Sequence, residues 1–367
     1  MRALAALAVA LVAGCPAAAP SRTTELRDPA VSDRDDGRGR LARELETEVR
    51  ASYQRPGLDA AAAAAIIDPA VGLVAIGVGP SDLVVGPVTS GRWPVTAVAG
   101  RPTAVVSRAL EVHVAADESL GWAYDEATLE LPVCGRVAAI PLRVFQVYAR
   151  DADRWTLVAE HLAYPQAMGR WLDAAVRADG SKLPEAVEQQ PGAVAARDAI
   201  AMAISPDGDR AASWDGALDA LAVWPDPLQV LRGGATRLGP SLAASLEATA
   251  VSVDGLRLAL GPTRQTAFAS ATLAARTVRV DPGGGERTVD VRLRATFVLE
   301  HAGDDGGPWR VRAAMVSVPI TAGALVGRTV GMAATMSPAV TSPGPCLRRY
   351  MVTGSSSSEE TTRPLRF

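Results

Sequence analysis

His161 is the residue in this sequence best suited to proton transfer, because an imidazole side chain titrates near neutral pH. It lies in the segment RWTLVAEHLAYP, Arg154–Pro165, whose counterpart further along the chain is PWRVRAAMVSVP, Pro308–Pro319. In both segments a proline follows a tryptophan by ten positions, but Met315 stands where the first segment has His161. The comparison leaves two readings open: His161 carries chemistry, or it is a structural residue whose hydrogen bonds are satisfied.

Several polar residues on the neighbouring predicted strands are candidate partners for His161. A histidine beside a carboxylate can act as a general acid–base pair. Alternation along a strand places Asp125 and Glu126 on opposite faces, so only one of them can face His161, and the sequence does not say which. Alternation counted from Trp155 puts Trp155 and His161 on the same buried face. The candidate pocket therefore consists of His161, Tyr124, Asp125, Glu126, Arg143, Gln146 and Trp155.

The sequence carries no motif for a metal, a cofactor or a nucleophile. Its three histidines lack the spacing of metal ligands, and the acidic runs DRDDGR and GDDGG lack that of a calcium loop. The glycine-rich stretch Asp281–Arg287 joins two predicted strands, which indicates a hairpin and not a phosphate-binding loop. Cys134 and Cys346 either pair as a disulfide or stay free thiols. We predict neither a metal nor a cofactor.

Composition and charge describe a globular protein of two domains. The chain has 367 residues, more than one hydrophobic core usually supports. Hydrophobic residues make up 48% and charged residues 21%, which is typical of globular proteins. The net charge of −3 provides no basic field, so we exclude nucleic acid as a partner.

The N-terminus predicts export and attachment to a membrane. Arg2 is followed by a short apolar run and by small residues before Cys15, which is the layout of a secretory signal. The segment LVAGC resembles the bacterial lipobox, whose cysteine is acylated, for example with palmitate, and becomes the first residue of the mature chain. The resemblance implies a signal peptide at 1–14 and a lipoprotein held in the cell envelope through Cys15. The alternative is an ordinary signal peptide cut elsewhere.

Beyond the signal, composition and periodicity predict the order of elements. Residues 15–39 are rich in Pro, Ala, Ser and mixed charges and predict a flexible tether. Helical spacing predicts helices at 41–53 and 57–69, and a series of alternating strands follows. A second helical stretch begins near Trp171, and a second set of strands follows it. The predicted boundaries are domain one at 40–168, a helical connection with domain two at 169–320, and a partly disordered extension at 321–367.

The two sets of strands are similar in sequence. PLRVFQV at 141–147 aligns with RLRATFV at 292–298, an offset of 151 residues. Trp155 and Trp309, which follow, align with an offset of 154, because the turn before the second tryptophan is longer. Two copies of one domain type are the simplest account.

The order of elements and some diffuse motifs repeat in both copies. Two helices precede an apolar strand beside a Gly- or Pro-rich loop, VGLVAIGVGPSDLVVG and LAVWPDPLQVLRGG, and a long meander then carries Arg-x-x-x-Val and a tryptophan. In the first copy the meander ends in Trp-x-x-x-x-x-His, and in the second Met315 replaces the histidine. This order, from about residue 41 to 320, resembles the SnoaL-like proteins of the nuclear transport factor 2-like superfamily. The resemblance implies an α+β fold with two cone-shaped domains, each a curved antiparallel sheet with helices packed on one face. It also implies that His161 lines a pocket inside the first cone.

The resemblance leaves the function open, because the family includes isomerases, cyclases, dehydratases, ligand binders and assembly modules. We expect a non-catalytic module that binds a small apolar or amphipathic ligand, or a protein partner, at the membrane. The alternative is an isomerase, cyclase or dehydratase that moves a proton with His161 and a carboxylate from the strand at 124–126. In a third reading the two copies, or two chains, pair through their sheets as an assembly module, which predicts filled cones and an exposed apolar sheet face.

Overall fold

The computed structural model describes residues 29–53, 73–79, 82–85, 104–133, 136–166, 182–187, 191–280, 283–302 and 307–320. Residues 1–37 form one unit, in which the described part is the start of a helix, and the chain from Arg38 onward forms a second, compact unit. Several predicted features lie outside the described residues: the signal peptide at 1–14, Cys15, the helix at 57–69, Cys134, Cys346 and the extension at 321–367.

Helix α1 (Pro29–Ser52) is the first described element, and it begins within the segment predicted as a tether. Proline suits the first position of a helix, because its φ angle is fixed near the helical value and its missing N–H needs no partner there. As the sequence spacing predicts, Leu41, Leu45 and Val49 are buried, and they pack on the first sheet. None of the described helices is both long enough and apolar enough to cross a membrane.

Six strands form the first sheet: β1 (Val74–Ile76), β2 (Leu83–Val85), β3 (Ala104–Val114), β4 (Leu120–Val133), β5 (Arg136–Asp151) and β6 (Arg154–Ala163). Their order in the sheet is β2-β1-β6-β5-β4-β3. Strands β3 to β6 form the expected antiparallel meander, whereas β1 lies parallel to β6. We call α1 together with this sheet the N-terminal half.

Seven strands form the second sheet: β7 (Ala186–Val187), β8 (Leu221–Val223), β9 (Val230–Arg232), β10 (Ala248–Leu260), β11 (Thr266–Val280), β12 (Glu286–His301) and β13 (Trp309–Ser317). The described helices beside it are α4 (Pro191–Ile204), α5 (Arg210–Ser213), α6 (Ala235–Leu238) and α7 (Leu242–Ser245). The strand order is β7-β10-β11-β12-β13-β8-β9, so apart from β7 it repeats the order of the first sheet, as the sequence repeat predicts. We call the second sheet with these helices the C-terminal half.

The strand registers identify equivalent residues in the two halves. Between β5 and β6, Phe145 pairs with His161, and between β12 and β13, Thr296 pairs with Met315. His161 and Met315 are therefore equivalent, as their positions in the sequence segments predict. The same registers give these equivalent residues: Phe145 and Thr296, Arg143 and Arg294, and Ala163 and Ser317.

A β-bulge in the last strand of each meander reverses the alternation of side chains. The bulged residue is Val158 in β6 and the equivalent Arg312 in β13. One extra residue moves every later side chain to the other face of the sheet. The prediction that Trp155 and His161 share a face is therefore wrong: Trp155 packs against α1, whereas His161 lies on the opposite face.

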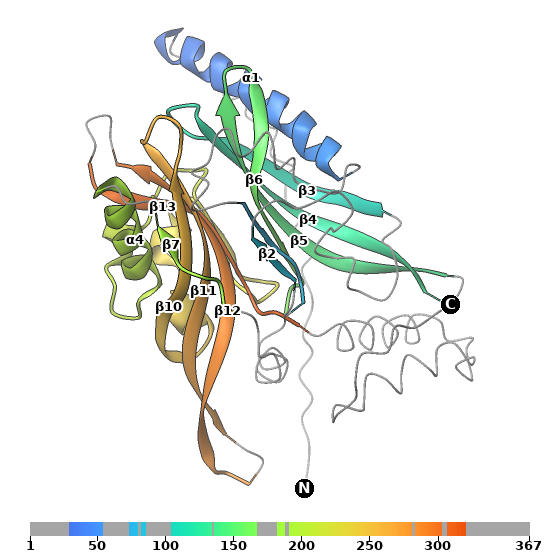
Figure 1. Cartoon of the computed structure of the whole chain (residues 1–367), viewed down its shortest axis with the longest axis vertical. Coiled ribbons are helices and arrows are strands. Elements are labelled where there is room, and N and C mark those ends of the chain that lie inside the picture. The colour runs from blue at the N-terminus through green and yellow to red at the C-terminus, as the bar shows by residue number, and fades with distance from the viewer. Residues whose placement is uncertain are drawn as a thin grey trace, which may run out of the picture. The chain divides into compact units, whose positions relative to one another are not determined.

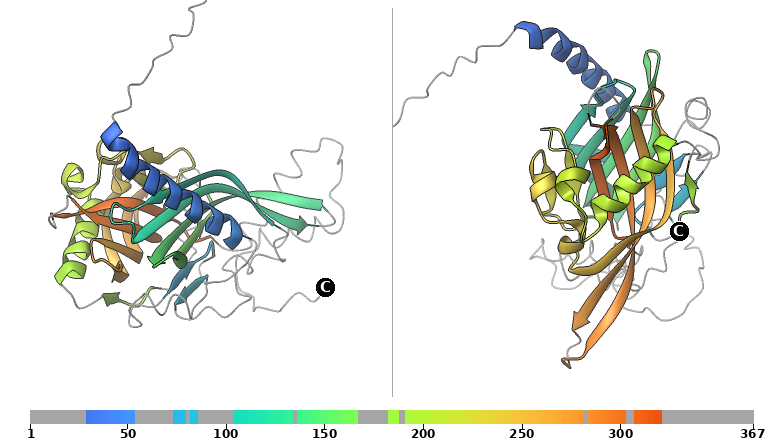
Figure 2. Two further views of the ribbon diagram at one scale, coloured as in Figure 1. Left: turned by 90° about the horizontal axis from the view of Figure 1, so that it is seen from above. Right: turned by 90° about the vertical axis from the view of Figure 1, so that its left-hand side faces the viewer.

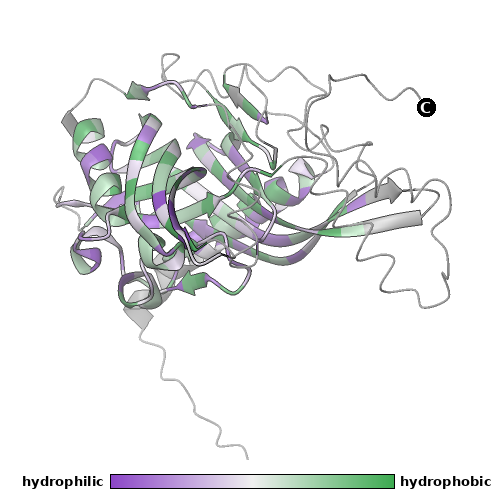
Figure 3. Cartoon of the chain, turned by 90° about the horizontal axis from the view of Figure 1, so that it is seen from below, coloured by the Kyte–Doolittle hydropathy of each residue, from purple (hydrophilic) through white to green (hydrophobic). Residues whose placement is uncertain are grey.

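Four layers are stacked in the described part of the chain from Arg38 onward: α1, the first sheet, the second sheet and α4 (Figure 1; Figure 2). Helix α1 covers one face of the first sheet, and α4 and α7 cover one face of the second. The other two faces pack against each other in one shared apolar cluster, which includes Trp122, Phe145, Val147, Phe268, Val298 and Met315. Hydrophobic residues are accordingly spread along the strands of both sheets (Figure 3).

Candidate functional site

His161 lies in the contact between the two sheets. Its side chain is completely buried. The ring atom Nε2 is 2.7 Å from Ser317 Oγ, and Nδ1 is 3.2 Å from Thr296 Oγ1. Burial, with a smaller contribution from the charge of Arg294, lowers the pKa of His161 to about 3. The imidazole is therefore neutral at physiological pH, and its one donor and one acceptor nitrogen both face hydroxyl groups of the C-terminal half.

The residues of the predicted pocket lie on two different faces of the first sheet. Asp125, Gln146 and Trp155 lie on the face that α1 covers. His161, Tyr124 and Arg143 lie on the face that meets the second sheet. Glu126 is exposed and accepts a hydrogen bond from the Tyr124 hydroxyl at 3.2 Å. The expected pair of His161 with a carboxylate is not formed, because the bulge at Val158 turns His161 away from Asp125.

A group of buried polar side chains lies under α1, and we call it the polar cluster: Ser52, Tyr53, Asp125, Gln146, Tyr148 and Glu160. Asp125 is its first centre, and its carboxylate is completely buried. The Tyr53 hydroxyl donates to Asp125 Oδ2 at 3.0 Å, and the amides of Arg108 and Ala109 donate to Oδ1 at 3.2 and 3.0 Å. A bulge at Arg108 in β3 makes both amides available. Burial first, and the Asp125 charge next, raise the pKa of Tyr53, so its hydroxyl stays protonated.

Gln146 is the second centre of the polar cluster. Its amide nitrogen donates to Glu160 Oε1 at 2.8 Å and to Ser52 Oγ at 3.1 Å. Its amide oxygen accepts a hydrogen bond from the Tyr148 hydroxyl at 2.9 Å. Gln146 and Glu160 are both buried. The cluster thus brings two carboxylates and two phenols together beneath the end of α1.

The strand positions of the C-terminal half that are equivalent to members of the polar cluster are apolar. By strand register, Asp125 corresponds to Ala271 and Gln146 to Phe297. Tyr148 corresponds to Leu299, and Glu160 to Ala314, and these four apolar residues belong to the core of the C-terminal half. That core also contains the tryptophans Trp214 and Trp224, which pack edge to face with their ring centres 5.6 Å apart. The two halves therefore share a topology but differ in the chemistry of their interiors.

Sequence reasoning missed four members of the polar cluster: Ser52, Tyr53, Tyr148 and Glu160. Glu160 was hidden by the assumption of strict alternation along β6. The apolar run Leu157, Val158 and Ala159 interrupts that alternation, and it is the signal that could have indicated the bulge. Ser52 and Tyr53 stand at the end of the first predicted helix, whose inward face the sequence defined only by its apolar residues.

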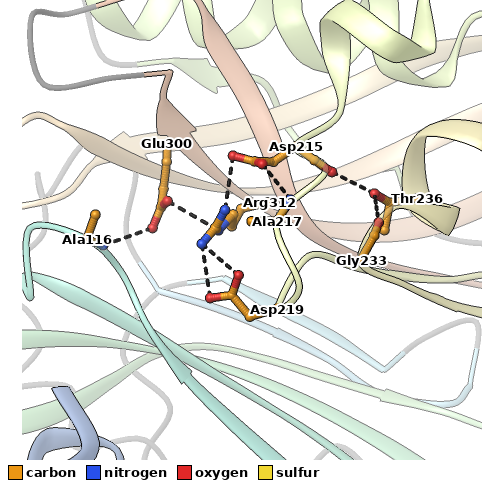
Figure 4. Close-up of polar contacts among 8 residues, drawn as sticks. All are labelled: Ala116, Asp215, Ala217, Asp219, Gly233, Thr236, Glu300 and Arg312. Atoms are coloured by element: carbon orange, nitrogen blue, oxygen red, sulfur yellow. Dashed lines mark hydrogen bonds and ion pairs between the residues drawn. The ribbon is translucent and has the colours of Figure 1, made fainter. Parts of the chain in front are cut away.

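Arg312, the bulged residue of β13, contacts three carboxylates at the edge of the sheet contact (Figure 4). Its guanidinium lies 3.0 Å from Asp215, 2.7 Å from Asp219 and 3.2 Å from Glu300. Glu300 also accepts a hydrogen bond at 3.3 Å from the Ala116 amide of the N-terminal half. Burial raises the pKa of Glu300 to about 7, even though Arg312 and the Ala116 amide favour its charged form.

This pKa shift predicts how Glu300→Gln changes the pH dependence of stability. The pKa of Glu300 is about 7 in the folded protein against an ordinary value of 4.5, so the folded state binds an extra proton between these two pH values. The contribution of Glu300 to stability therefore falls as pH rises through this window. The free energy of unfolding of the variant minus that of the wild type should rise by about 3 kcal/mol as the pH increases from 4.5 to about 7. Urea unfolding at several pH values checks this, and a difference that does not vary with pH would contradict it.

Metal ligation finds no support in the part of the chain that the structure describes, where no group of three or more His, Cys, Asp or Glu side chains could hold an ion.

Comparisons with known proteins give similarities of fold. No protein-family model and no curated protein matches the sequence. One similar solved structure is a putative calcium/calmodulin dependent protein kinase II association domain from Xanthomonas campestris, with 19% identity, a TM-score of 0.28, and coverage of 38% of this chain and 94% of that one. Another is a nuclear transport factor 2-like superfamily protein from Salmonella enterica serovar Typhimurium, with 17% identity, a TM-score of 0.23, and coverage of 29% and 73%. A third is an Ntf2-like protein involved in plasmid conjugation, with 9% identity, a TM-score of 0.19, and coverage of 59% and 76%. At these identities the likeness concerns the fold alone.

Proposed function

We propose that this chain is a non-catalytic binding protein of the bacterial cell envelope, anchored through Cys15. The N-terminal half binds a small amphipathic ligand on the face of its sheet that α1 covers. The C-terminal half serves as its structural partner. The proposal rests on one observation: the interior of the N-terminal half holds the polar cluster, whereas the equivalent interior positions of the C-terminal half are apolar.

Buried polar groups are costly unless they are hydrogen-bonded, and buried carboxylates are the most costly of them. The C-terminal half demonstrates that this fold is completed with alanine, phenylalanine and leucine at the equivalent positions. The carboxylates of Asp125 and Glu160 are therefore not required by the topology. Buried ionisable groups that gather at one place are typical of functional sites.

The chemistry of the cluster indicates an amphipathic ligand. Asp125 and Glu160 provide acceptors for hydroxyl or amine donors, and the Tyr53 and Tyr148 hydroxyls add groups that donate or accept. Apolar side chains from α1 and β6 border these groups, among them Val49 and Trp155. A ligand with an apolar body and a few hydrogen-bonding groups matches both kinds of surface.

The alternative functions have less support. An enzyme that relies on His161 would need a carboxylate within reach of the imidazole, but both ring nitrogens of His161 face hydroxyl groups. An assembly module would present an apolar sheet face to a partner, but the apolar faces of the two sheets cover each other.

The double variant Asp125→Asn, Glu160→Gln tests the proposal. Native mass spectrometry of the protein purified from the envelope of its expression host should reveal a non-covalently bound small molecule in the wild type. The double variant should lose that molecule, because two acceptors are weakened, while Glu126→Gln, a change at the adjacent but exposed position, should retain it. Retention of the same molecule by the double variant would refute the proposed site. A wild type without any bound molecule, together with a more stable double variant, would make the cluster a structural feature.

A further inference from the structure

The contact between the two halves contains a reciprocal pair of arginines. Arg143 donates to the carbonyl oxygens of the β8–β9 turn, Trp224 at 2.7 Å, Asp226 at 3.1 Å and Pro227 at 2.9 Å. The equivalent Arg294 donates to the carbonyl oxygens of the β1–β2 turn, Gly77 at 3.4 Å, Gly79 at 2.8 Å and Asp82 at 3.1 Å. The halves thus contact each other as the two subunits of an isologous dimer do. Because every chain has main-chain carbonyls, these contacts hold the halves together but do not distinguish one half from the other.

The centre of the contact is different, because its side chains are not equivalent. His161 of the N-terminal half faces Ser317 and Thr296 of the C-terminal half through its two ring nitrogens. In the reciprocal position stands Met315, which shares the apolar cluster with Ala163 and Phe145, the equivalents of Ser317 and Thr296. The polar imidazole thus meets two hydroxyl groups, and the apolar thioether meets apolar side chains.

We propose that this arrangement makes the N-terminal half select the C-terminal half, and not a second copy of itself, as its partner. In a pair of two N-terminal halves, each His161 would face Ala163 and Phe145, and its buried ring nitrogens would lack partners. In a pair of two C-terminal halves, each Met315 would face Ser317 and Thr296, and their buried hydroxyl groups would lack partners. The loss of hydrogen bonds at one His161, or at one pair of Ser317 and Thr296, disfavours pairing by about tenfold or more. A like pair is symmetric and therefore suffers this loss twice. The mixed pair is therefore favoured over either like pair by about a hundredfold.

Exchange between chains cut at the connection tests the selectivity. A protease site inserted within 167–181 allows the folded full-length protein to be cut between the two sheets, and cut samples with and without 15N label are then mixed. Native mass spectrometry should detect labelled N-terminal halves with unlabelled C-terminal halves, and the reverse. Pairs of two N-terminal or of two C-terminal halves should make up roughly one in a hundred pairs or fewer. His161→Met should raise the fraction of pairs that consist of two N-terminal halves at least tenfold. Like pairs that are abundant in the wild type, or equally rare in the wild type and in His161→Met, would overturn the proposal.

A double-mutant cycle on the uncut chain gives a second test, which does not depend on the stability of the cut halves. His161→Met and Ser317→Ala should each lower the melting temperature by several degrees, because each leaves a buried polar group of the partner without its hydrogen bond. The double variant should melt close to His161→Met alone, since Ser317→Ala then removes a hydroxyl that is already unsatisfied. If the two losses in melting temperature simply added, His161 and Ser317 would not depend on each other, and the proposed basis of the selectivity would be overturned.

Discussion

Replacing Arg294 with methionine should lower the free energy of unfolding at pH 7 by about 3 to 5 kcal/mol. The Arg294 side chain is 1% exposed and donates to three carbonyl oxygens of the β1–β2 turn across the sheet contact. Methionine fills a similar volume but donates no hydrogen bond, so these carbonyls would lose their charged donor in a dry contact. The Gly79 and Asp82 carbonyls would keep only the hydrogen bonds that they accept from the main-chain amides of Asp82 and Gly77. Burial lowers the pKa of Arg294 to about 10, so the guanidinium is still charged at pH 7 and its hydrogen bonds are the stronger for it.

Urea unfolding of the full chain measures the effect of this change. Arg143→Met is the matched variant, because Arg143 makes the reciprocal contacts with the β8–β9 turn, and it should be destabilised to a similar extent. Arg276→Met is the control: this exposed residue of β11 pairs only across the sheet surface with Asp290, and its loss should leave the midpoint unchanged. If Arg294→Met unfolded at the same urea concentration as Arg276→Met, the arginine pair would not hold the halves together.

The second large effect concerns pH and His161. The pKa of His161 is about 3 in the folded protein against an ordinary value of 6.5. Below pH 6.5 the unfolded chain binds a proton that the folded protein excludes, so the contribution of neutral His161 is complete above this value and is lost as pH falls toward 3. At pH 5 the loss is about 2 kcal/mol, and below pH 3 it approaches about 5 kcal/mol.

Comparison of the wild type with His161→Met isolates this loss, because the other titrating groups are common to both proteins. At pH 7.5 the wild type should be the more stable of the two, since methionine leaves Ser317 and Thr296 without their partner. The advantage of the wild type should shrink as pH falls to 5, by about 2 kcal/mol. Glu300 titrates with the opposite sign, so the wild-type curve alone would hide the effect. If the free energy of unfolding had the same pH dependence in the two proteins, the imidazole would not be excluded from water.

Much of the fold was predictable because the sequence repeats itself. The aligned segments PLRVFQV and RLRATFV occupy equivalent parts of β5 and β12, and they include the two arginines of the sheet contact. The apolar spacing of Leu41, Leu45 and Val49 correctly indicated the face of α1 that packs on the sheet. Local periodicity is sufficient for such assignments, since it reflects which side of an element is buried.

The candidate site could be predicted only in part. Alternation correctly separated Asp125 from Glu126, and Asp125 is the one inside. The position of His161 was wrong because a single bulged residue reverses every later side chain, and a sequence pattern read with period two does not register that shift. The partners of His161 were also out of reach, since Thr296 and Ser317 lie 135 and 156 residues away in sequence. A polar side chain in a strand can find its hydrogen-bond partners on either face of the sheet. For His161, the packing of the second sheet decides which residues these partners are.

The two halves are packed sheet against sheet as one unit, and an engineered cross-link tests this packing most directly. Ser119 Oγ, just before β4, and Thr266 Oγ1, at the start of β11, are 3.1 Å apart, so cysteines at these positions should lie within reach of a disulfide. The double variant Ser119→Cys, Thr266→Cys should form an intramolecular disulfide during expression in an oxidising compartment, detected by peptide mapping without reduction. The control pair Ser119→Cys, Ser252→Cys, whose second cysteine lies on an exposed part of β10, should not form one. If the cysteines at 119 and 266 were instead fully alkylated in the folded protein, the packing of the two halves described here would be wrong.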